Sequence, residues 1–177
     1  IIKVSKKEGY VLETGVSDLI ALLGDGSFRD TLGILQKVIS TIEDKKISIK
    51  EIEMITGAPK GSLVNDFIIA LAHNEKEKAL SVISSAREDN ISMKIFISLI
   101  LEKVRIILLL KNAPALAKVL KEQVSEDDWK VLEHISKDEK NKINSAVLLE
   151  LLRAYDSTGR AYIESLPLEM AVVAVCG

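Results

Sequence analysis

The sequence predicts an all-α protein in which helices pack on helices. Hydrophobic residues make up 47% of the 177-residue chain but aromatic residues only 4%, so the core is expected to be aliphatic and large enough for one large or two small domains. The chain contains only nine glycines and three prolines, and this scarcity of helix-breaking residues favours helices. Apolar residues recur three and four positions apart along most of the chain, as they do on one face of a helix.

The first two helices are expected over residues 1–8 and 14–23. The first pattern is that of the last turns of a helix that ends at Gly9. Because the chain also begins in that helix without a methionine, we expect it to be a piece of a longer protein. In the second pattern, apolar residues repeat at three and four, and Thr14 or Ser17 is in position to cap the helix.

A glycine corner and a charged helix start follow, in the stretch GDGSFRDTLGILQKVIS. Gly26 permits backbone angles that are closed to other residues, and Ser27 is a common N-cap type. A helix is therefore expected to begin near Ser27 or Phe28, and its apolar face continues to about Glu43. Arg29 lies at the polar start of this helix.

A capped helix starting at Ser48 is expected next, in preference to a strand around Ile47 and Ile49. The stretch Gly57-Ala58-Pro59-Lys60-Gly61 is then the strongest break in the chain. We place a domain boundary there, which gives a first part over residues 1–56 and a second part over residues 57–177. Helix length distinguishes the two parts, because the helices of the second part are longer and have more strongly apolar faces.

The second part is expected to be helical throughout. Its helices cover residues 62–73, 75–86, 92–111, 115–123, 125–135, 144–163 and 167–174. Ser125 and Asp128 have the spacing of a capping box, so helix capping and solvation explain the acidic run Glu126-Asp127-Asp128 better than a metal or acid-base site does. Trp129 is interpreted as core or groove packing, with partner binding as the alternative.

The helix over residues 92–111 is the most apolar of the chain, and a membrane span has to be considered for it. Four charged residues near its middle exclude that reading, because charges are costly in hydrocarbon: Lys94, Glu102, Lys103 and Arg105. The helix is therefore either the central core helix, or a helix with part of its surface against another subunit.

Composition excludes several classes of function. A net charge of −2 and an isoelectric point of 5.8 leave no electrostatic footprint for gripping DNA through bulk charge. Cys176 is the only cysteine, which rules out an intramolecular disulfide or a cysteine zinc cluster and suits a reducing cytoplasm. His73 and His134 have no ligand neighbours at metal-binding spacing, so no metal site is expected.

Two interpretations of Arg29 follow from its position. It is either a surface arginine paired with Asp25 or Asp30, which contributes about 0–1 kcal/mol, or a fixed phosphate sensor. The second interpretation rests on the guanidinium group, whose rigid fork of donors matches phosphate oxygens and is always charged.

The stretch around Arg29 resembles a segment of the bacterial DNA polymerase III gamma/tau subunits that usually reads A-D-G-S-x-R-D-A-L-S-L-L-D-Q-A-I. The closing sequence PLEMAVVAVCG, Pro167–Gly177, is similar to the last helix of the same family. This family is an AAA+ clamp loader, and the resemblance implies that Arg29 is its sensor 2 residue, which reaches the terminal phosphate of ATP, with weaker roles for Gly26 and Ser27. Three positions depart from the usual residues without removing the arginine: Thr31, Gly33 and Lys37.

The resemblance also implies the fold of each part. Residues 1–56 would be the small helical AAA+ lid domain, and residues 57–177 the helical collar that holds clamp loader subunits in a ring. The ATPase domain of the family would precede Ile1. The chain has no G-x-x-x-x-G-K-[ST] motif, so no ATP hydrolysis, no catalytic residues and no metal are expected in this stretch, and ATP is expected as a cofactor only with the preceding domain.

The partners that the resemblance implies are the other clamp loader subunits: delta, delta prime and further gamma/tau copies, which allows a homo-oligomer. The sliding clamp and primed DNA would be reached through the whole complex, in the cytoplasm and without a membrane. The alternative is an all-helical scaffold or adaptor in which Arg29 is a surface residue and senses no nucleotide.

Overall fold

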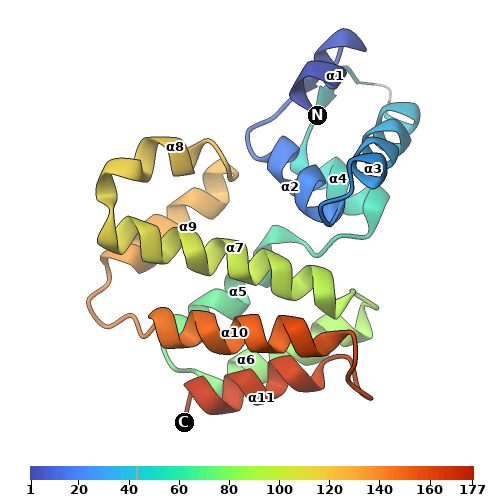
Figure 1. Cartoon of the computed structure of the whole chain (residues 1–177). Coiled ribbons are helices and arrows are strands. Elements are labelled where there is room, and N and C mark those ends of the chain that lie inside the picture. Colours follow the sequence, from blue (N-terminus) through green and yellow to red (C-terminus); the bar gives the residue numbers. More distant parts are fainter. Residues whose placement is uncertain (43) are drawn as a thin grey trace.

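The computed structural model describes residues 1–42 and 44–177 (Figure 1), and it confirms the all-α prediction. Eleven α-helices, one short 3-10 helix and two strands of two residues each are found in these residues. The helices are α1 (Ile2–Lys7), α2 (Val16–Leu23), α3 (Phe28–Thr41), α4 (Ile49–Thr56), α5 (Gly61–Ala72), α6 (Lys76–Glu88), α7 (Met93–Asn112), α8 (Ala117–Lys121), α9 (Glu126–Lys137), α10 (Ser145–Thr158) and α11 (Leu166–Val175). The 3-10 helix is η1 (Pro114–Leu116), and the strands are β1 (Val11–Leu12) and β2 (Lys46–Ile47).

Two separate groups of buried apolar side chains divide the described chain into two lobes. The first lobe contains α1 to α4 with β1 and β2, and the second lobe contains α5 to α11. In Figure 1 the blue and cyan helices of the first lobe stand apart from the green-to-red helices of the second. The chain passes between them through residues 57–60. The assignment of these lobes as a lid and a collar stays a prediction.

In the first lobe, α2, α3 and α4 pack against one another around a small aliphatic core. Its fully buried members come from all three helices and from β2: Val16, Ile20, Leu35, Val38, Ile47 and Ile52. The predicted helix from Ser48 is confirmed as α4, which has a complete capping box formed by Ser48 and Glu51. Helix α3 ends at Thr41, because Ile42 is already in extended backbone as its C-cap, so it stops short of the predicted end near Glu43, a residue outside the described part of the chain.

One local prediction for the first lobe was wrong, and one local feature was missed. Neither Thr14 nor Ser17 caps α2, because its N-cap is Gly15 at a φ of +84° with no side-chain hydrogen bond. The pairing of β1 with β2 was not foreseen either. The two strands run parallel, with Val11 opposite Lys46 and Leu12 opposite Ile47, and two residues are too few to produce an alternating pattern in the sequence.

The second lobe is built around α7, which packs against α5, α9 and α10. This arrangement agrees with the interpretation of residues 92–111 as the central core helix, and Phe96 of α7 meets Phe67 of α5 edge to face at 5.7 Å between ring centroids. Trp129 is 7% exposed and belongs to the same core. Among the described residues, no helix combines the length and the apolar character that a bilayer span requires.

The last two helices differ in how well they were predicted. Helix α10 ends at Thr158 instead of continuing past Gly159 toward Ile163, because residues 159–164 form turns before the next helix. Helix α11 carries Pro167 in its first turn, as predicted.

Directly after α11, the Cys176 side chain packs into the second lobe with 5% exposure, and burial raises the pKa of its thiol.

Candidate functional site

The corner between α2 and α3 is built by backbone angles that few residues adopt. Asp25 has a φ of +46° and Gly26 a φ of +78°, so two successive residues lie in the left-handed region. Ser27 then caps α3, since its Oγ accepts a hydrogen bond from the Asp30 N–H at 3.2 Å. The predicted helix start at Ser27 or Phe28 is thereby confirmed.

Arg29 lies in the first turn of α3 and is exposed to solvent. Within the described residues it makes no ion pair and no side-chain hydrogen bond, so it is paired with neither Asp25 nor Asp30. The Asp25 carboxylate is bound to Lys94 instead. The guanidinium group is therefore accessible to a ligand or to another chain, and its assignment as sensor 2 stays a prediction.

The backbone beneath Arg29 is closely packed. Gly24 is buried, and a Cβ atom added there would lie 2.0 Å from Oγ1 of Thr31. Thr31 itself is 8% exposed, and its N–H donates to the Ser27 carbonyl at 3.0 Å. The corner and the first turn of α3 therefore form one compact unit, and Arg29 projects from a fixed base.

Two of the three departures from the family pattern have a local explanation in the structure. Thr31 fills the space against Gly24 described above. Lys37 donates from Nζ to the carbonyl oxygen of Ile55 at 2.9 Å, near the C-terminal end of α4, where a cation is favourable. Gly33 has no heavy atom within 4 Å of the position that a Cβ would take, and nothing in the structure explains it.

A second group of polar residues joins this corner to the second lobe. Lys94, in the first turn of α7, places Nζ 2.7 Å from Oδ2 of Asp25 and 5.6 Å from the centre of the Tyr155 ring. The Tyr155 hydroxyl of α10 donates to Oδ1 of Asp25 at 3.4 Å. The hydrogen bond and charge of Lys94 lower the pKa of Asp25, and Asp25 raises the pKa of Lys94. Sequence reasoning missed this contact, because Asp25 was considered only as a turn residue or a partner of Arg29.

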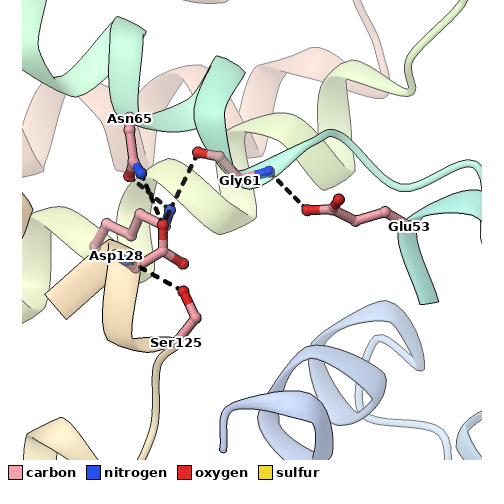
Figure 2. A network of polar contacts seen from close by, with 6 residues as sticks. Glu53, Gly61, Asn65, Ser125 and Asp128 are labelled. Carbon is pink, nitrogen blue, oxygen red and sulfur yellow. Dashed lines mark hydrogen bonds and ion pairs between the residues drawn. The ribbon is translucent and has the colours of Figure 1, made fainter. Parts of the chain in front are cut away.

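A groove of about 1240 Å³ lies between the two lobes, with α4 on one side and the starts of α5 and α9 on the other. Glu53 of α4 lines it and accepts a hydrogen bond from the Gly61 N–H at 2.7 Å (Figure 2). This bond supplies a carboxylate cap to α5, whose own N-cap residue Lys60 provides none. Partial burial raises the pKa of Glu53, and the nearby Asp128 charge adds to the rise.

Lys103 of α7 contacts two residues that line this groove, Asn65 and Asp128, and only 5% of its own surface is exposed. Its Nζ is 2.5 Å from Oδ1 of Asp128, 2.7 Å from Oδ1 of Asn65 and 3.5 Å from the Gly61 carbonyl oxygen. Asn65 Nδ2 in turn donates to Oδ1 of Asp128 at 2.8 Å, as Figure 2 shows. Burial lowers the pKa of Lys103, while Asp128 acts in the opposite direction.

The Lys103 network corrects the interpretation of two residues. Asp128 was expected to complete a capping box, but only half of that motif forms: Ser125 Oγ accepts from the Asp128 N–H at 3.1 Å, and the Asp128 carboxylate binds Lys103. Lys103 was considered only as a charge within an apolar helix. Its spacing of three from Ile100 and seven from Phe96 places it on the buried face of α7, and this periodicity could have identified it.

Other residues considered as metal ligands are not brought together. No group of three or more histidine, cysteine, aspartate or glutamate side chains with the geometry of a metal site occurs in the part of the chain that the structure describes. His73 places Nδ1 3.9 Å from the carboxylate of Asp138, and His134 is exposed on α9.

Comparison with known proteins gives one relationship in sequence and one in fold. No family model matches the sequence. It is 25% identical over 112 residues to DNA polymerase III subunit gamma/tau from Mycobacterium bovis and from Mycobacterium tuberculosis, a match that covers 63% of this chain. The match covers 19% of those relatives, so the chain corresponds to about a fifth of their length.

The solved structure of the Bacillus subtilis DNA clamp loader delta protein superposes with a TM-score of 0.52. The superposition covers 99% of this chain and 54% of that protein, at 14% sequence identity, and therefore relates the two in fold. The chain is thus similar in sequence to part of the gamma/tau subunits of DNA polymerase III, and its all-helical fold is similar to the matched part of a clamp loader delta protein.

Proposed function

We propose that this chain is the lid and collar region of a gamma/tau-type subunit, part of the ATP-dependent clamp loader that places the sliding clamp on primed DNA. Arg29 would contact the terminal phosphate of an ATP molecule held by a preceding ATPase domain, with Gly26 and Ser27 shaping the corner that carries it. The observation that carries this proposal is an arginine that is exposed, and unpaired among the described residues, on a closely packed helix start within a stretch that resembles the sensor 2 motif.

The proposed role uses the physical properties of that helix start. The N-terminal end of α3 has a partial positive charge from its peptide dipoles, and Arg29 adds a full one. A phosphate near this end would be attracted by both, and a guanidinium can bind two of its oxygens at once. Movement of the first lobe toward or away from the nucleotide would then report whether the terminal phosphate is present.

The second lobe would assemble with delta, delta prime and further gamma/tau copies. Five apolar side chains on neighbouring helices α10 and α11 support this part of the proposal, since each has between 42% and 58% of its surface exposed and exposed apolar surface is typical of protein interfaces. They are Leu149, Leu152, Leu166, Met170 and Val173. The sliding clamp and DNA would be partners of the complete complex in the cytoplasm, and this chain would not hydrolyse ATP by itself.

Arg29→Ala in the full-length protein, assembled into its clamp loader, tests the proposal. We expect clamp loading and ATP hydrolysis to fall about tenfold or more, because a charged hydrogen bond to phosphate is lost from the transition state. The midpoint of thermal unfolding should stay within about 2 °C of the unsubstituted protein, because an exposed, unpaired side chain contributes little to stability.

Two further variants sharpen this test. Arg29→Lys keeps the charge but loses the fork of donors, so it should recover only part of the activity. Arg160→Ala removes another exposed arginine, in the second lobe, and should leave loading unchanged. Normal loading by Arg29→Ala would contradict the sensor role and favour the all-helical scaffold without nucleotide sensing.

A further inference from the structure

Asp25 stands between the proposed sensor and the second lobe. It is four residues before Arg29 and belongs to the compact corner that starts α3, where the Ser27 N–H donates to the Gly24 carbonyl at 2.8 Å and the Asp25 N–H to the Leu22 carbonyl at 3.1 Å. Because this corner is hydrogen-bonded and packed against Thr31, a displacement of Asp25 is passed to the first turn of α3.

The Asp25 side chain reaches the other lobe. Its two carboxylate oxygens have separate partners there, since Oδ2 binds Lys94 of α7 at 2.7 Å and Oδ1 accepts from Tyr155 of α10 at 3.4 Å. Lys94 also lies over the Tyr155 ring, so the three side chains hold one another in place. The lowered pKa of Asp25 is consistent with a carboxylate that stays ionised in this contact.

The backbone at Asp25 makes this contact specific. Residues other than glycine are uncommon in the left-handed region, and although aspartate tolerates it better than most, glycine would be the less strained residue at a φ of +46°. A glycine would have no carboxylate to reach Lys94. The corner thus adopts this backbone angle at a position whose side chain connects it with α7 and α10.

We propose that Asp25 is a positioning residue for Arg29. Through Lys94 and Tyr155 it holds the α2–α3 corner against the second lobe, so the position of Arg29 depends on the arrangement of the two lobes relative to each other. This inference rests on the proposed role of Arg29 in sensing ATP. It adds that the arginine is coupled to α7 through the Asp25–Lys94 ion pair and to α10 through the hydrogen bond from Tyr155.

The test uses the full-length protein in its assembled clamp loader, with ATP as the ligand. Asp25→Asn keeps a residue type that tolerates the left-handed region but removes the charge, and Lys94→Gln removes the opposite charge. Each should raise the half-saturating ATP concentration for hydrolysis about two- to fivefold, the range that an exposed ion pair produces, with a smaller change in the maximal rate. The double variant should be no worse than either single one.

The control variants separate positioning from structure. Lys137→Gln breaks an exposed ion pair of similar length inside α9, 2.9 Å to Glu133, and should leave the half-saturating ATP concentration unchanged. Tyr155→Phe keeps the ring beneath Lys94 and loses only the hydroxyl, so it gives a milder version of the Asp25→Asn effect without risk to the corner. Thermal unfolding of each variant checks that the fold is retained.

Comparing the effect of Asp25→Asn in the unsubstituted protein and in the Arg29→Ala protein shows whether Asp25 acts through Arg29. If Asp25 works through Arg29, Asp25→Asn has no further effect once the arginine is gone. An equal effect in both backgrounds, or no effect of Asp25→Asn in a protein that Arg29→Ala damages, would overturn the positioning role and leave the sensor proposal standing. Full activity of Arg29→Ala would overturn the sensor proposal and the positioning role together.

Discussion

Lys103 is a charged residue in the interior of the second lobe, and its three oxygen partners explain how it is tolerated there. Moving an ammonium group out of water is costly unless each of its donors finds an acceptor. Asp128, Asn65 and the Gly61 carbonyl oxygen supply those acceptors from α9 and α5. The same residue therefore fixes how three helices of the second lobe meet.

Lys103→Met should be strongly destabilising, although the substitution keeps an unbranched apolar stem. It leaves the Asp128 carboxylate, which is only 14% exposed, without its cation, and breaking a largely buried pair from one side costs up to about 3–5 kcal/mol. Urea unfolding measures this loss, and Trp129 reports on it directly, because it is the only tryptophan in the chain and follows Asp128 on α9.

Two variants serve as controls for this prediction. Arg105→Met removes a cation from the same helix, but Arg105 is about half exposed and paired with Glu102, so the loss should be about 0–1 kcal/mol. Lys103→Met combined with Asp128→Asn removes both charges and should recover part of the stability. A Lys103→Met protein as stable as the Arg105→Met protein would show that the buried pair is not a main contributor.

At the scale of single elements, α4 shows how a short helix is started by its own sequence. Ser48 Oγ accepts from the Glu51 N–H at 3.3 Å, and the Glu51 carboxylate accepts from both the N–H and the hydroxyl of Ser48 at 2.7 Å. The bond from the Ser48 N–H is the main cause of the lowered pKa of Glu51, and the hydroxyl adds to it.

Ser48→Ala should destabilise the protein by about 1 kcal/mol near neutral pH, the usual cost of losing an N-cap. Because the pKa of Glu51 is lowered in the folded state, the stability that its carboxylate contributes is present above its ordinary pKa of 4.5 and is lost as the pH falls through the folded value. The penalty of Ser48→Ala should therefore shrink below pH 4.5.

Urea unfolding across a pH series measures this difference. Ser81→Ala is a suitable control, because Ser81 is exposed in the middle of α6 and makes no side-chain hydrogen bond within the described residues. A penalty for Ser48→Ala that stays constant through the acid range would mean that the Glu51 carboxylate is not part of the cap.

The sequence predicted most helices, because caps and apolar periodicity are local signals. Ser27, Ser48 and Pro167 each marked a helix start that the structure confirms. The N-cap of α2 was predicted wrongly, because Gly15 is set there by a close contact with Val124 and Ser125, which are distant in sequence. Arg29 could be located on its helix from the sequence, but the partners of Lys103 and Asp25 depend on how α7 packs, which no local pattern encodes.

At the scale of the whole molecule, the two lobes meet at a few close contacts. The Asp25–Lys94 pair is one, and the bond from Gly61 to Glu53 is another. The third is Gly15, where an added Cβ would lie 3.0 Å from the Ser125 nitrogen and 3.0 Å from the Val124 carbonyl carbon. At this point the backbone of the first lobe lies directly against the start of α9.

Gly15→Ala should therefore disturb the lobe contact, and Gly9→Ala is its matched control. Both glycines have a φ above +80°, so each alanine pays the left-handed penalty of about 1–2 kcal/mol. Only the alanine at Gly15 also meets backbone, since nothing lies within 4 Å of a Cβ at Gly9. We expect Gly15→Ala to lose more unfolding free energy than Gly9→Ala. We also expect it to show faster amide hydrogen exchange at the start of α9. Equal losses of unfolding free energy in the two variants would contradict a tight contact at Gly15.

The buried thiol after α11 gives the chain a chemical reporter that needs no engineering. Cys176 is the only cysteine, and burial both shields it and raises its pKa, so a thiol-reactive reagent should modify it slowly while α11 is docked. The rate of modification then follows the opening of the C-terminal end alone. Labelling kinetics on the free chain and on its assemblies would show whether a binding partner clamps this end of the molecule or leaves it free to open.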